Sequence, residues 1–369
     1  MKTVRKSCTN LDGLMPYDPK YLAASAYLSA NENPNDMPEE IRREVDKKIR
    51  SLTFNRYPDP LANELRDLIA EGNGLERENI LVGNGGDELL FNLALAWGGP
   101  GRVFLDLPPT FSVYENNARL TGTATEVIPR RADYSIDEEA VLKRLSMNDI
   151  DCIIIASPNN PTGQLADDSF LVKVLEASDA LVVIDEAYFE FSRRTMRPYL
   201  EQHKNLVILR TFSKAFSLAG VRMGYVLAHP EVITELIKVR QPYSVDSVSQ
   251  EIAKVVYQNR AQFEERIREL IEQREWLIKE LRKTPEVNVY PSDSNYILFK
   301  IEDAQPIWEA LYNEGILIRD LSNVRYLEDC LRVTIGTEEE NRLFLSTLKQ
   351  CLEQRRKSVS RGQAPGVQK

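Results

Sequence analysis

The sequence predicts an α/β fold in which helices cover both faces of a mostly parallel sheet and a smaller α+β domain follows. The first observation is that short apolar runs alternate with helical patterns between about residues 80 and 228, as they do in sheets built from βαβ units. The second is that this alternation stops after about Ser244, where one long amphipathic pattern begins. With 369 residues, 43% of them hydrophobic, the chain is large enough for a large and a smaller domain.

The predicted strands of the larger domain are apolar runs bounded by Gly, Pro, Asn or Asp, a setting typical of strands buried on both faces. They are Ile80–Val82, Val103–Leu107, Cys152–Ala156, Leu181–Ile184, Leu206–Leu209 and Tyr225–Ala228. Helices are expected between them at Glu88–Ala96, Ser112–Leu120, Glu138–Leu145 and Asp168–Ala177. Because parallel strands need crossover connections, this order favours a parallel sheet.

The pattern after Ser244 predicts a long helix, three strands and a closing helix. Apolar residues recur at helical spacing from Phe263 to Leu281, which indicates one amphipathic helix. Strands are expected at Tyr296–Phe299, Ile316–Ile318 and Leu331–Ile335, and a last helix with Leu343, Phe344, Leu348 and Leu352 on one face. The tail from Arg355 to Lys369 is basic and aperiodic, so we expect it to be disordered.

Composition and charge exclude several classes of function. The net charge of −9 makes nucleic acid a poor partner, because binding to its phosphates needs a basic surface. The four cysteines and two histidines offer no zinc-like set and no CxxC pair; they are Cys8, Cys152, Cys330, Cys351, His203 and His229. We therefore expect no metal, and we expect buried, reduced thiols at Cys152 and Cys351. The start of the sequence lacks the apolar core of a signal peptide, and we expect a cytoplasmic protein without a membrane span.

Lys214 is the most informative single residue, because it lies just past a buried-looking strand. It stands in Thr-Phe-Ser-Lys-Ala-Phe-Ser-Leu-Ala-Gly-Val-Arg at positions 211–222. Lysines normally lie on solvated surfaces, so this position calls for a chemical reason. A Schiff base is such a reason, with hydroxyls and Arg222 nearby to hold an anionic cofactor. Taken alone, a loop of small residues with one lysine is also compatible with a structural role.

Three other segments place polar groups just past strands, where ligands gather in α/β sheets. Residues 83–88 read Gly-Asn-Gly-Gly-Asp-Glu, which suits an anion at a helix N-terminus or a tight turn with Asp87 as N-cap. Residues 157–163 read Ser-Pro-Asn-Asn-Pro-Thr-Gly, a rigid turn that aims an asparagine amide. Asp185 ends a buried strand; a buried carboxylate needs a partner, either a protonated pyridine nitrogen or an arginine.

Together these segments resemble the pyridoxal-phosphate aminotransferases of fold type I, and within them the histidinol-phosphate aminotransferases. Thr211 to Gly220 resembles the lysine signature of that family, and residues 157–163 resemble its asparagine motif. Other matching pieces are Asn-Glu-Asn-Pro at 31–34, Arg-Tyr-Pro at 56–58, Pro-Pro-Thr-Phe at 108–111, Ile-Arg-Asp at 318–320 and Leu-Arg-Val-Thr-Ile-Gly at 331–336. The similarity runs from about residue 11 to 353.

The resemblance implies a fold and a domain organisation. It implies a large domain with a mostly parallel seven-stranded sheet between helices, and a smaller α+β domain. We expect a flexible N-terminus at 1–10, an arm at 11–45 that contributes to the small domain, and the large, cofactor-binding domain at 46–244. The small domain is expected at 245–354 and the disordered tail at 355–369.

The resemblance also implies how the cofactor, pyridoxal 5′-phosphate, is held. Lys214 would form the Schiff base and act as the base that moves a proton, and Asp185 would keep the pyridine nitrogen protonated. Asn160 and Tyr188 would donate to the phenolate oxygen. Phe111 would stack on the ring, at a position where enteric members of the family carry Tyr; the stacking surface is kept and a hydroxyl is lost.

The cofactor phosphate and a second subunit belong to the same expectation. Backbone groups at Gly86 and Asp87, the hydroxyls of Thr211 and Ser213, and the Arg222 guanidinium would bind the phosphate. In the family, the tyrosine of Arg-Tyr-Pro reaches this phosphate from the neighbouring subunit. Tyr57 therefore predicts a homodimer with shared active sites; without the resemblance it would be an aromatic residue in a surface turn.

For the substrate, the resemblance implies two anion sites. Arg332 would bind the α-carboxylate of the amino acid co-substrate, Asn160 would also contact the substrate, and Tyr17 and Arg319 would take the phosphate of histidinol phosphate. Arg319 could equally pair with Asp320, and Tyr17 could be a core residue. The expected reaction is amino transfer between L-histidinol phosphate and 2-oxoglutarate in histidine biosynthesis (EC 2.6.1.9).

Two other activities share the cofactor residues. An aromatic amino acid aminotransferase would use the same scaffold with another substrate. An L-threonine O-phosphate decarboxylase would break a different bond of a phosphorylated amine. A non-enzymatic, cofactor-sensing regulator is disfavoured, because about ten residues before Leu11 leave no room for a DNA-binding domain.

Overall fold

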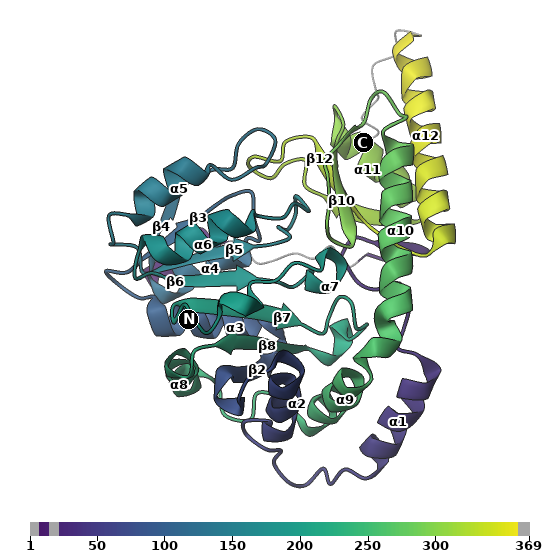
Figure 1. The fold of residues 1–369 in the computed structure, drawn as a ribbon. Coiled ribbons are helices and arrows are strands. Elements are labelled where there is room, and N and C mark those ends of the chain that lie inside the picture. Colours follow the sequence, from purple (N-terminus) through teal and green to yellow (C-terminus); the bar gives the residue numbers. More distant parts are fainter. Residues whose placement is uncertain (1–6, 15–21, 361–369) are drawn as a thin grey trace, which may run out of the picture.

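The computed structural model describes residues 7–14 and 22–360, which form two sheets with helices packed around them (Figure 1). The large sheet has seven strands in the order β2-β8-β7-β6-β5-β3-β4. Its strands are β2 (Ile80–Asn84), β3 (Val103–Asp106), β4 (Ala124–Val127), β5 (Cys152–Ala156), β6 (Leu181–Asp185), β7 (Leu206–Thr211) and β8 (Met223–Ala228). Only β8 runs antiparallel to its neighbours β2 and β7 in this sheet. The prediction of a mostly parallel seven-stranded sheet is confirmed.

All six apolar runs read from the sequence as strands of this sheet are strands. The strand β4 is the one that the reading missed, because it has no apolar run. Its sequence Ala-Thr-Glu-Val lies at the edge of the sheet and is partly exposed, so its composition resembles that of a loop. Glu126 of β4 forms an ion pair with Arg144.

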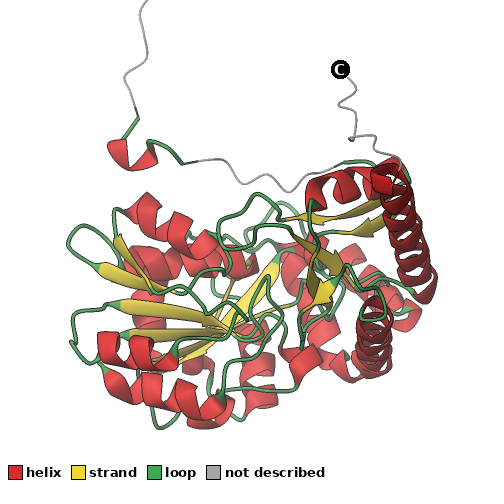
Figure 2. Cartoon of the chain, turned by 90° about the horizontal axis from the view of Figure 1, so that it is seen from above, coloured by secondary structure: helices red, strands yellow, loops and turns green. Residues whose placement is uncertain are grey.

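Alternate residues of the central strands face two different layers of helices. Ile154 and Ala156 of β5 belong to a core with residues of α3, α4 and α8, whereas Ile153 and Ile155 belong to the larger core on the other face. Figure 2 shows helices on both sides of this sheet. The helices between residues 63 and 239 are α2 (Asn63–Asn73), α3 (Gly85–Trp97), α4 (Val113–Thr121), α5 (Glu138–Leu145), α6 (Asp168–Ala177), α7 (Phe189–Ser192) and α8 (Pro230–Val239).

The second sheet has the order β1-β11-β12-β10-β9 and is mixed, since β1 and β11 are parallel and the other pairs antiparallel. Its strands are β1 (Ala26–Leu28), β9 (Asn288–Val289), β10 (Tyr296–Lys300), β11 (Ile316–Asp320) and β12 (Cys330–Thr334). The remaining helices are α1 (Glu39–Arg50), α9 (Ser247–Gln258), α10 (Glu264–Leu281), α11 (Ala304–Asn313) and α12 (Glu338–Ser360), with short 3₁₀ helices at Thr9–Leu11, Arg77–Asn79, Arg197–Tyr199, Ala219–Val221 and Arg260–Phe263. The expected long helix is α10, which lies beside α12 (Figure 1).

The expected disorder from Arg355 onward is wrong for residues 355–360, which continue α12. Arg355 pairs with Asp303 at 2.7 Å and Arg356 donates to Glu286 at 2.7 Å. The basic residues that suggested a solvated tail thus have acidic partners just before α11 and β9. The division of the chain into domains stays a prediction.

Two further observations complete the fold. The buried thiols expected at Cys152 and Cys351 are confirmed, and all four cysteines are free. In the described ranges, no helix combines the length and the apolar character that crossing a membrane requires.

The carboxyl ends of the parallel strands meet the small sheet. Past β5, the backbone carbonyl of Asn159 accepts a hydrogen bond of 2.6 Å from Tyr296 Oη on β10. Just beyond, Asn160 is hydrogen-bonded to Arg332 on β12. This junction brings the polar residues that follow β5, β6 and β7 up against side chains of the second sheet.

Candidate active site

Lys214 lies three residues past the end of β7 and points its amine at the segment after β1. Its Nζ donates to the carbonyl oxygen of Ala30 at 3.0 Å. Burial, and next the positive charge of Arg332, lower the pKa of Lys214 to about 8. Asp87 and Arg222 also act on it electrostatically, so these charges share one site. An amine with a pKa near neutrality can gain and lose a proton at physiological pH.

Asp185 is the last residue of β6 and is 6% exposed. Its Oδ2 accepts a hydrogen bond of 2.7 Å from Tyr114 Oη, and its Oδ1 accepts one of 3.0 Å from the backbone N–H of Ala187. Burial raises the pKa of Asp185 to about 6. Within the described part of the chain, no lysine or arginine forms an ion pair with it. The arginine partner that the sequence left open is therefore not seen there, and the carboxylate suits a cationic group of a ligand.

A cluster of donors forms where α3 begins and β7 ends. Arg222 donates to Asp87 Oδ2 at 2.8 Å and to Ser213 Oγ at 3.5 Å. The backbone N–H of Ser213 donates to Thr211 Oγ1 at 3.1 Å. Gly86 and Asp87 are in the first turn of α3, whose unpaired N–H groups and dipole favour an anion. Five predicted phosphate ligands are thus brought together.

Glycines allow this cluster to form, because backbone and side chains pass very close to one another. A Cβ on Gly224 would lie 2.7 Å from the backbone nitrogen of Gly86, and one on Gly85 would lie 2.5 Å from Arg222 Nη2. Gly85 also has a φ of +77°, which side chains disfavour. A cradle that any Cβ would fill, beside an arginine and a helix N-terminus, fits a phosphate group.

Asn160 and Arg332 join the loop after β5 to the five-stranded sheet. Arg332 donates to Asn160 Oδ1 and, at 2.7 Å, to the carbonyl oxygen of Ser29. Its guanidinium lies 5.2 Å from the ring centroid of Tyr296. Tyr296 in turn meets Tyr188 edge to face, with ring centroids 5.0 Å apart. The side chain of Asn31 donates to Tyr188 Oη at 2.8 Å and fixes the position of that hydroxyl.

Arg319 and Arg332 face each other across β11 and β12, where they are register partners. Directly opposed residues of antiparallel strands have side chains on the same face, and like charges there repel each other. Arg332 is buried and Arg319 half-buried. Two cations held side by side at partial burial can bind an anionic ligand.

The remaining predicted residues are Phe111, Tyr57 and Tyr17. Phe111 is half-buried and meets Tyr114 edge to face at 5.7 Å. Tyr57 is 81% exposed and stacks on Tyr243, with centroids 4.5 Å apart. Tyr17 lies outside the described residues.

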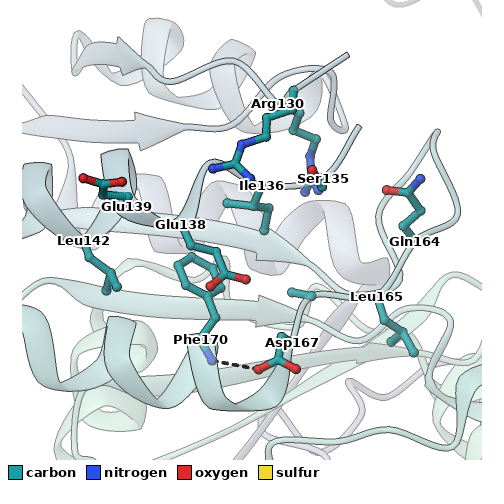
Figure 3. A pocket seen from close by; sticks show the side chains of 12 residues that line it. Arg130, Ser135, Ile136, Glu138, Glu139, Leu142, Gln164, Leu165, Asp167 and Phe170 are labelled. Carbon is teal, nitrogen blue, oxygen red and sulfur yellow. Dashed lines mark hydrogen bonds between the residues drawn. The ribbon is translucent and has the colours of Figure 1, made fainter. Parts of the chain in front are cut away.

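A pocket lies elsewhere, between α5, α6 and the loops before them (Figure 3). It has a volume of about 690 Å³, and none of the predicted site residues is among the described residues that line it. Its wall carries charges of both signs, including Arg130, Glu138 and Asp167, with Ile136 and Phe170 beneath them. We place the candidate active site at the strand ends instead, because the perturbed pKa values of Lys214 and Asp185 arise there.

Sequence reasoning missed two contributors to this site. Tyr114 stands three residues after Phe111, within the helix expected at Ser112–Leu120, and the sequence assigned it no role. Asn31 was noted as part of a matching motif without a role, although it contacts both Tyr188 and Thr334. A buried tyrosine needs a hydrogen-bond partner, but this rule cannot name a partner 71 positions away.

Comparison with known proteins identifies the family. Residues 26–348 match the family model for aminotransferases of class I and II. A histidinol-phosphate aminotransferase of Carboxydothermus hydrogenoformans is 42% identical over 340 residues, which cover 92% of this chain and 96% of that protein. One from Thermococcus kodakarensis is 41% identical, with 88% and 92% covered.

Solved structures agree. The histidinol-phosphate aminotransferase of Clostridium acetobutylicum has a TM-score of 0.82 at 25% identity, over 89% of this chain and 99% of that one. That of Sinorhizobium meliloti, in complex with pyridoxal 5′-phosphate, has a TM-score of 0.87 at 21% identity, over 95% and 99%; at this identity it shows the shared fold. The chain belongs to the class I and II aminotransferase family, in which relatives over most of its length are histidinol-phosphate aminotransferases.

Proposed function

We propose that this chain transfers the amino group of L-histidinol phosphate to 2-oxoglutarate, giving imidazole acetol phosphate and L-glutamate, with pyridoxal 5′-phosphate as cofactor. The reaction is a step of L-histidine biosynthesis. The observation that carries the proposal is the pair of arginines, Arg319 and Arg332, opposed on β11 and β12. Two relatives above 40% identity, both histidinol-phosphate aminotransferases, support it.

The cofactor would be held at its two ends by the two clusters of the site. Arg222, Ser213 and Thr211, with the backbone at Gly86 and Asp87, form the cradle that suits its phosphate. At the other end, the carboxylate of Asp185 would accept a hydrogen bond from the protonated ring nitrogen. That nitrogen supplies the positive charge that this buried carboxylate needs. Asn160 and Tyr188 would donate hydrogen bonds to the ring oxygen, and Phe111 would cover one ring face.

Lys214 would be the group that moves the proton. When bound, the cofactor supplies an aldehyde that condenses with amines and a ring that withdraws electrons. The lowered pKa of about 8 keeps a useful fraction of Lys214 unprotonated near neutral pH, as a general base needs. Its position beside the Ala30 carbonyl restricts the amine to one side of the site.

Arg319 and Arg332 would bind the anionic groups of the two substrates in turn. Glutamate and 2-oxoglutarate carry a carboxylate next to the reacting carbon, which Arg332 would bind. Histidinol phosphate lacks this carboxylate and carries a phosphate, which Arg319 would bind with Tyr17. The neighbouring positive charge would strengthen the binding of either anion.

We also propose a cytoplasmic homodimer with shared sites. Tyr57 and Phe54 are 81% and 72% exposed in the single chain. Large exposed aromatic side chains at one turn are typical of an interface. A second copy of the chain would cover them, and the Tyr57 hydroxyl would donate a hydrogen bond to the cofactor phosphate bound by that second copy. Sedimentation should give a dimer, and Tyr57→Ala should weaken cofactor binding without altering the Lys214 cluster of its own chain.

The deciding experiment is single-turnover conversion of the bound cofactor to its pyridoxamine form, monitored by absorbance. Histidinol phosphate, phenylalanine and threonine phosphate should be compared at equal concentration. We expect histidinol phosphate to react fastest, and Arg319→Gln to slow it far more than it slows glutamate. Faster reaction with phenylalanine would favour an aromatic aminotransferase.

Carbon dioxide release from threonine phosphate would favour a decarboxylase instead. A decarboxylase of that specificity from Porphyromonas gingivalis shares the fold, with a TM-score of 0.79 and 26% identity. The absence of any absorbance from bound cofactor would refute the whole scheme.

A further inference from the structure

Tyr114 is a buried tyrosine that touches the carboxylate expected to face the cofactor ring. It lies in the first turn of α4 and is 4% exposed. Its hydroxyl donates to Asp185 Oδ2 at 2.7 Å, and its ring meets Phe111 edge to face. The backbone N–H of Tyr114 donates to the carbonyl of Phe111 at 3.1 Å, which holds the two aromatic residues in one turn. One short segment therefore determines the surroundings of both Asp185 and the residue expected to stack on the ring.

The hydrogen bond has one direction only. Burial, and next the Asp185 charge, raise the pKa of Tyr114 well above its usual value, so the phenol keeps its proton and donates it. A neutral donor supports the anionic carboxylate without cancelling its charge. An arginine in the same place would satisfy Asp185 completely and leave nothing for a ligand cation to neutralise.

The other groups near Asp185 act in the opposite sense. Burial raises its pKa most, and the carboxylates of Asp87 and Glu186 raise it further. The hydroxyls of Tyr188 and Tyr296 lie near enough to interact electrostatically with Tyr114 or with Asp185 itself. The hydrogen bonds of Tyr114 and of the Ala187 N–H are the contributions that lower the pKa.

We infer that Tyr114 is a positioning residue, which keeps Asp185 ionised and directed at the ring nitrogen of pyridoxal phosphate. The inference rests on the proposed function, since it needs the ring to lie against Asp185. Tyr114 touches neither substrate nor reacting atoms in this account and acts through the carboxylate alone. Its hydroxyl should therefore matter only for ligands whose ring contains the nitrogen.

The test compares two ligands on two proteins. Apoprotein with and without Tyr114→Phe is titrated with pyridoxal phosphate and with an analogue in which CH replaces the ring nitrogen. We expect Tyr114→Phe to weaken pyridoxal phosphate about tenfold, the size of one hydrogen bond to a charged group. The analogue should bind the two proteins equally. Equal binding of pyridoxal phosphate by both proteins, or equal weakening of both ligands, overturns the inference.

Tyr257→Phe is the matched control. Tyr257 is also 4% exposed, and its hydroxyl donates to the carbonyl of Ile69 at 3.5 Å, between α9 and α2 and outside the candidate site. Loss of this hydroxyl should leave both affinities unchanged. If it weakens pyridoxal phosphate as Tyr114→Phe does, the effect is general loosening and the inference is wrong.

A second measurement needs no bound cofactor and can be used if Tyr114→Phe folds poorly. The carboxyl carbon of Asp185, assigned by its absence in Asp185→Asn, is titrated by NMR in the apoprotein. A fluorotyrosine at position 114 keeps the ring and hydroxyl but donates more strongly, so the pKa of Asp185 should fall; an unchanged or raised pKa refutes the inference. A chain that binds no pyridoxal phosphate at all would refute the proposed function. The titration of Asp185 in the apoprotein would still show whether Tyr114 lowers the pKa of that carboxyl, so the two failures can be told apart.

Discussion

Gly224→Ala tests whether the phosphate cradle depends on backbone contact. Gly224 lies between two strands, as register partner of Gly83 on β2 and Thr211 on β7. An added Cβ would lie 2.7 Å from the nitrogen of Gly86 and 2.8 Å from the carbonyl carbon of Gly85, whereas ordinary contacts begin at 3.4 Å. Both obstructing atoms are backbone, so no side chain can rotate away. The start of α3 must therefore move by about 0.7 Å.

A movement of this size is large compared with a hydrogen bond. An N–H donor about 2.9 Å from a phosphate oxygen would be displaced to about 3.6 Å, where the bond is largely lost. Each lost bond to a charged group costs about 1.5–3 kcal/mol. With one or two backbone donors displaced, we expect cofactor affinity to fall at least about tenfold. The buried strands themselves should stay paired, because the change affects the end of β8 only.

The assay is equilibrium titration of apoprotein with pyridoxal phosphate, and the matched control is Gly220→Ala. Gly220 is in the same part of the chain, and nothing lies within 4 Å of the Cβ it would gain. Gly220→Ala should bind the cofactor as the unchanged protein does. Undiminished affinity in Gly224→Ala, with its structure intact by circular dichroism, would refute the reasoning about the cradle.

Three further outcomes follow from buried charges of the apoprotein. The pKa of Asp185 is raised to about 6 from 3.8, so the native state binds the extra proton and stability is lost as pH rises from about 4 to 6; Asp185→Asn should be more stable at pH 7 by up to about 3 kcal/mol in urea unfolding, while binding the cofactor more weakly. The pKa of Lys214 is lowered to about 8 from 10.5, so the unfolded state holds more protons in that window and stability rises from pH 8 to 10.5; Lys214→Met should abolish this rise. Arg210 donates to Glu186 at 2.9 Å with both side chains almost fully buried; Arg210→Met should cost about 3–5 kcal/mol by denaturant titration, and adding Glu186→Leu should recover much of it. The first two accounts would be contradicted if Asp185→Asn or Lys214→Met left the pH dependence of the unfolding free energy unchanged. The third would be contradicted if the destabilisations caused by Arg210→Met and Glu186→Leu simply added.

Most of the fold could be predicted, because its elements are local patterns. The strand β5 is Cys-Ile-Ile-Ile-Ala, and a short apolar run of this kind between turns is typical of a strand buried on both faces. The prediction was wrong at residues 355–360, where the partners Asp303 and Glu286 are more than fifty positions away. The positive charges of this segment predict an exposed tail. The ion pairs that hold it become visible only when the distant acidic residues are brought next to it by folding.

The sequence by itself predicted the family, and it pointed to the residues proposed to bear the chemistry. Lys214, Asp185 and Asn160 stand just past strands, and the order of these motifs along the chain led to the resemblance. Only the tertiary structure decided what surrounds them. Tyr114 reaches Asp185 across 71 positions, and Gly224 meets Gly86 because β8 is inserted between β2 and β7. The reason is physical: strand and helix formation follow from neighbouring residues, whereas a hydrogen bond or a steric contact between distant segments depends on how the finished sheet and helices pack.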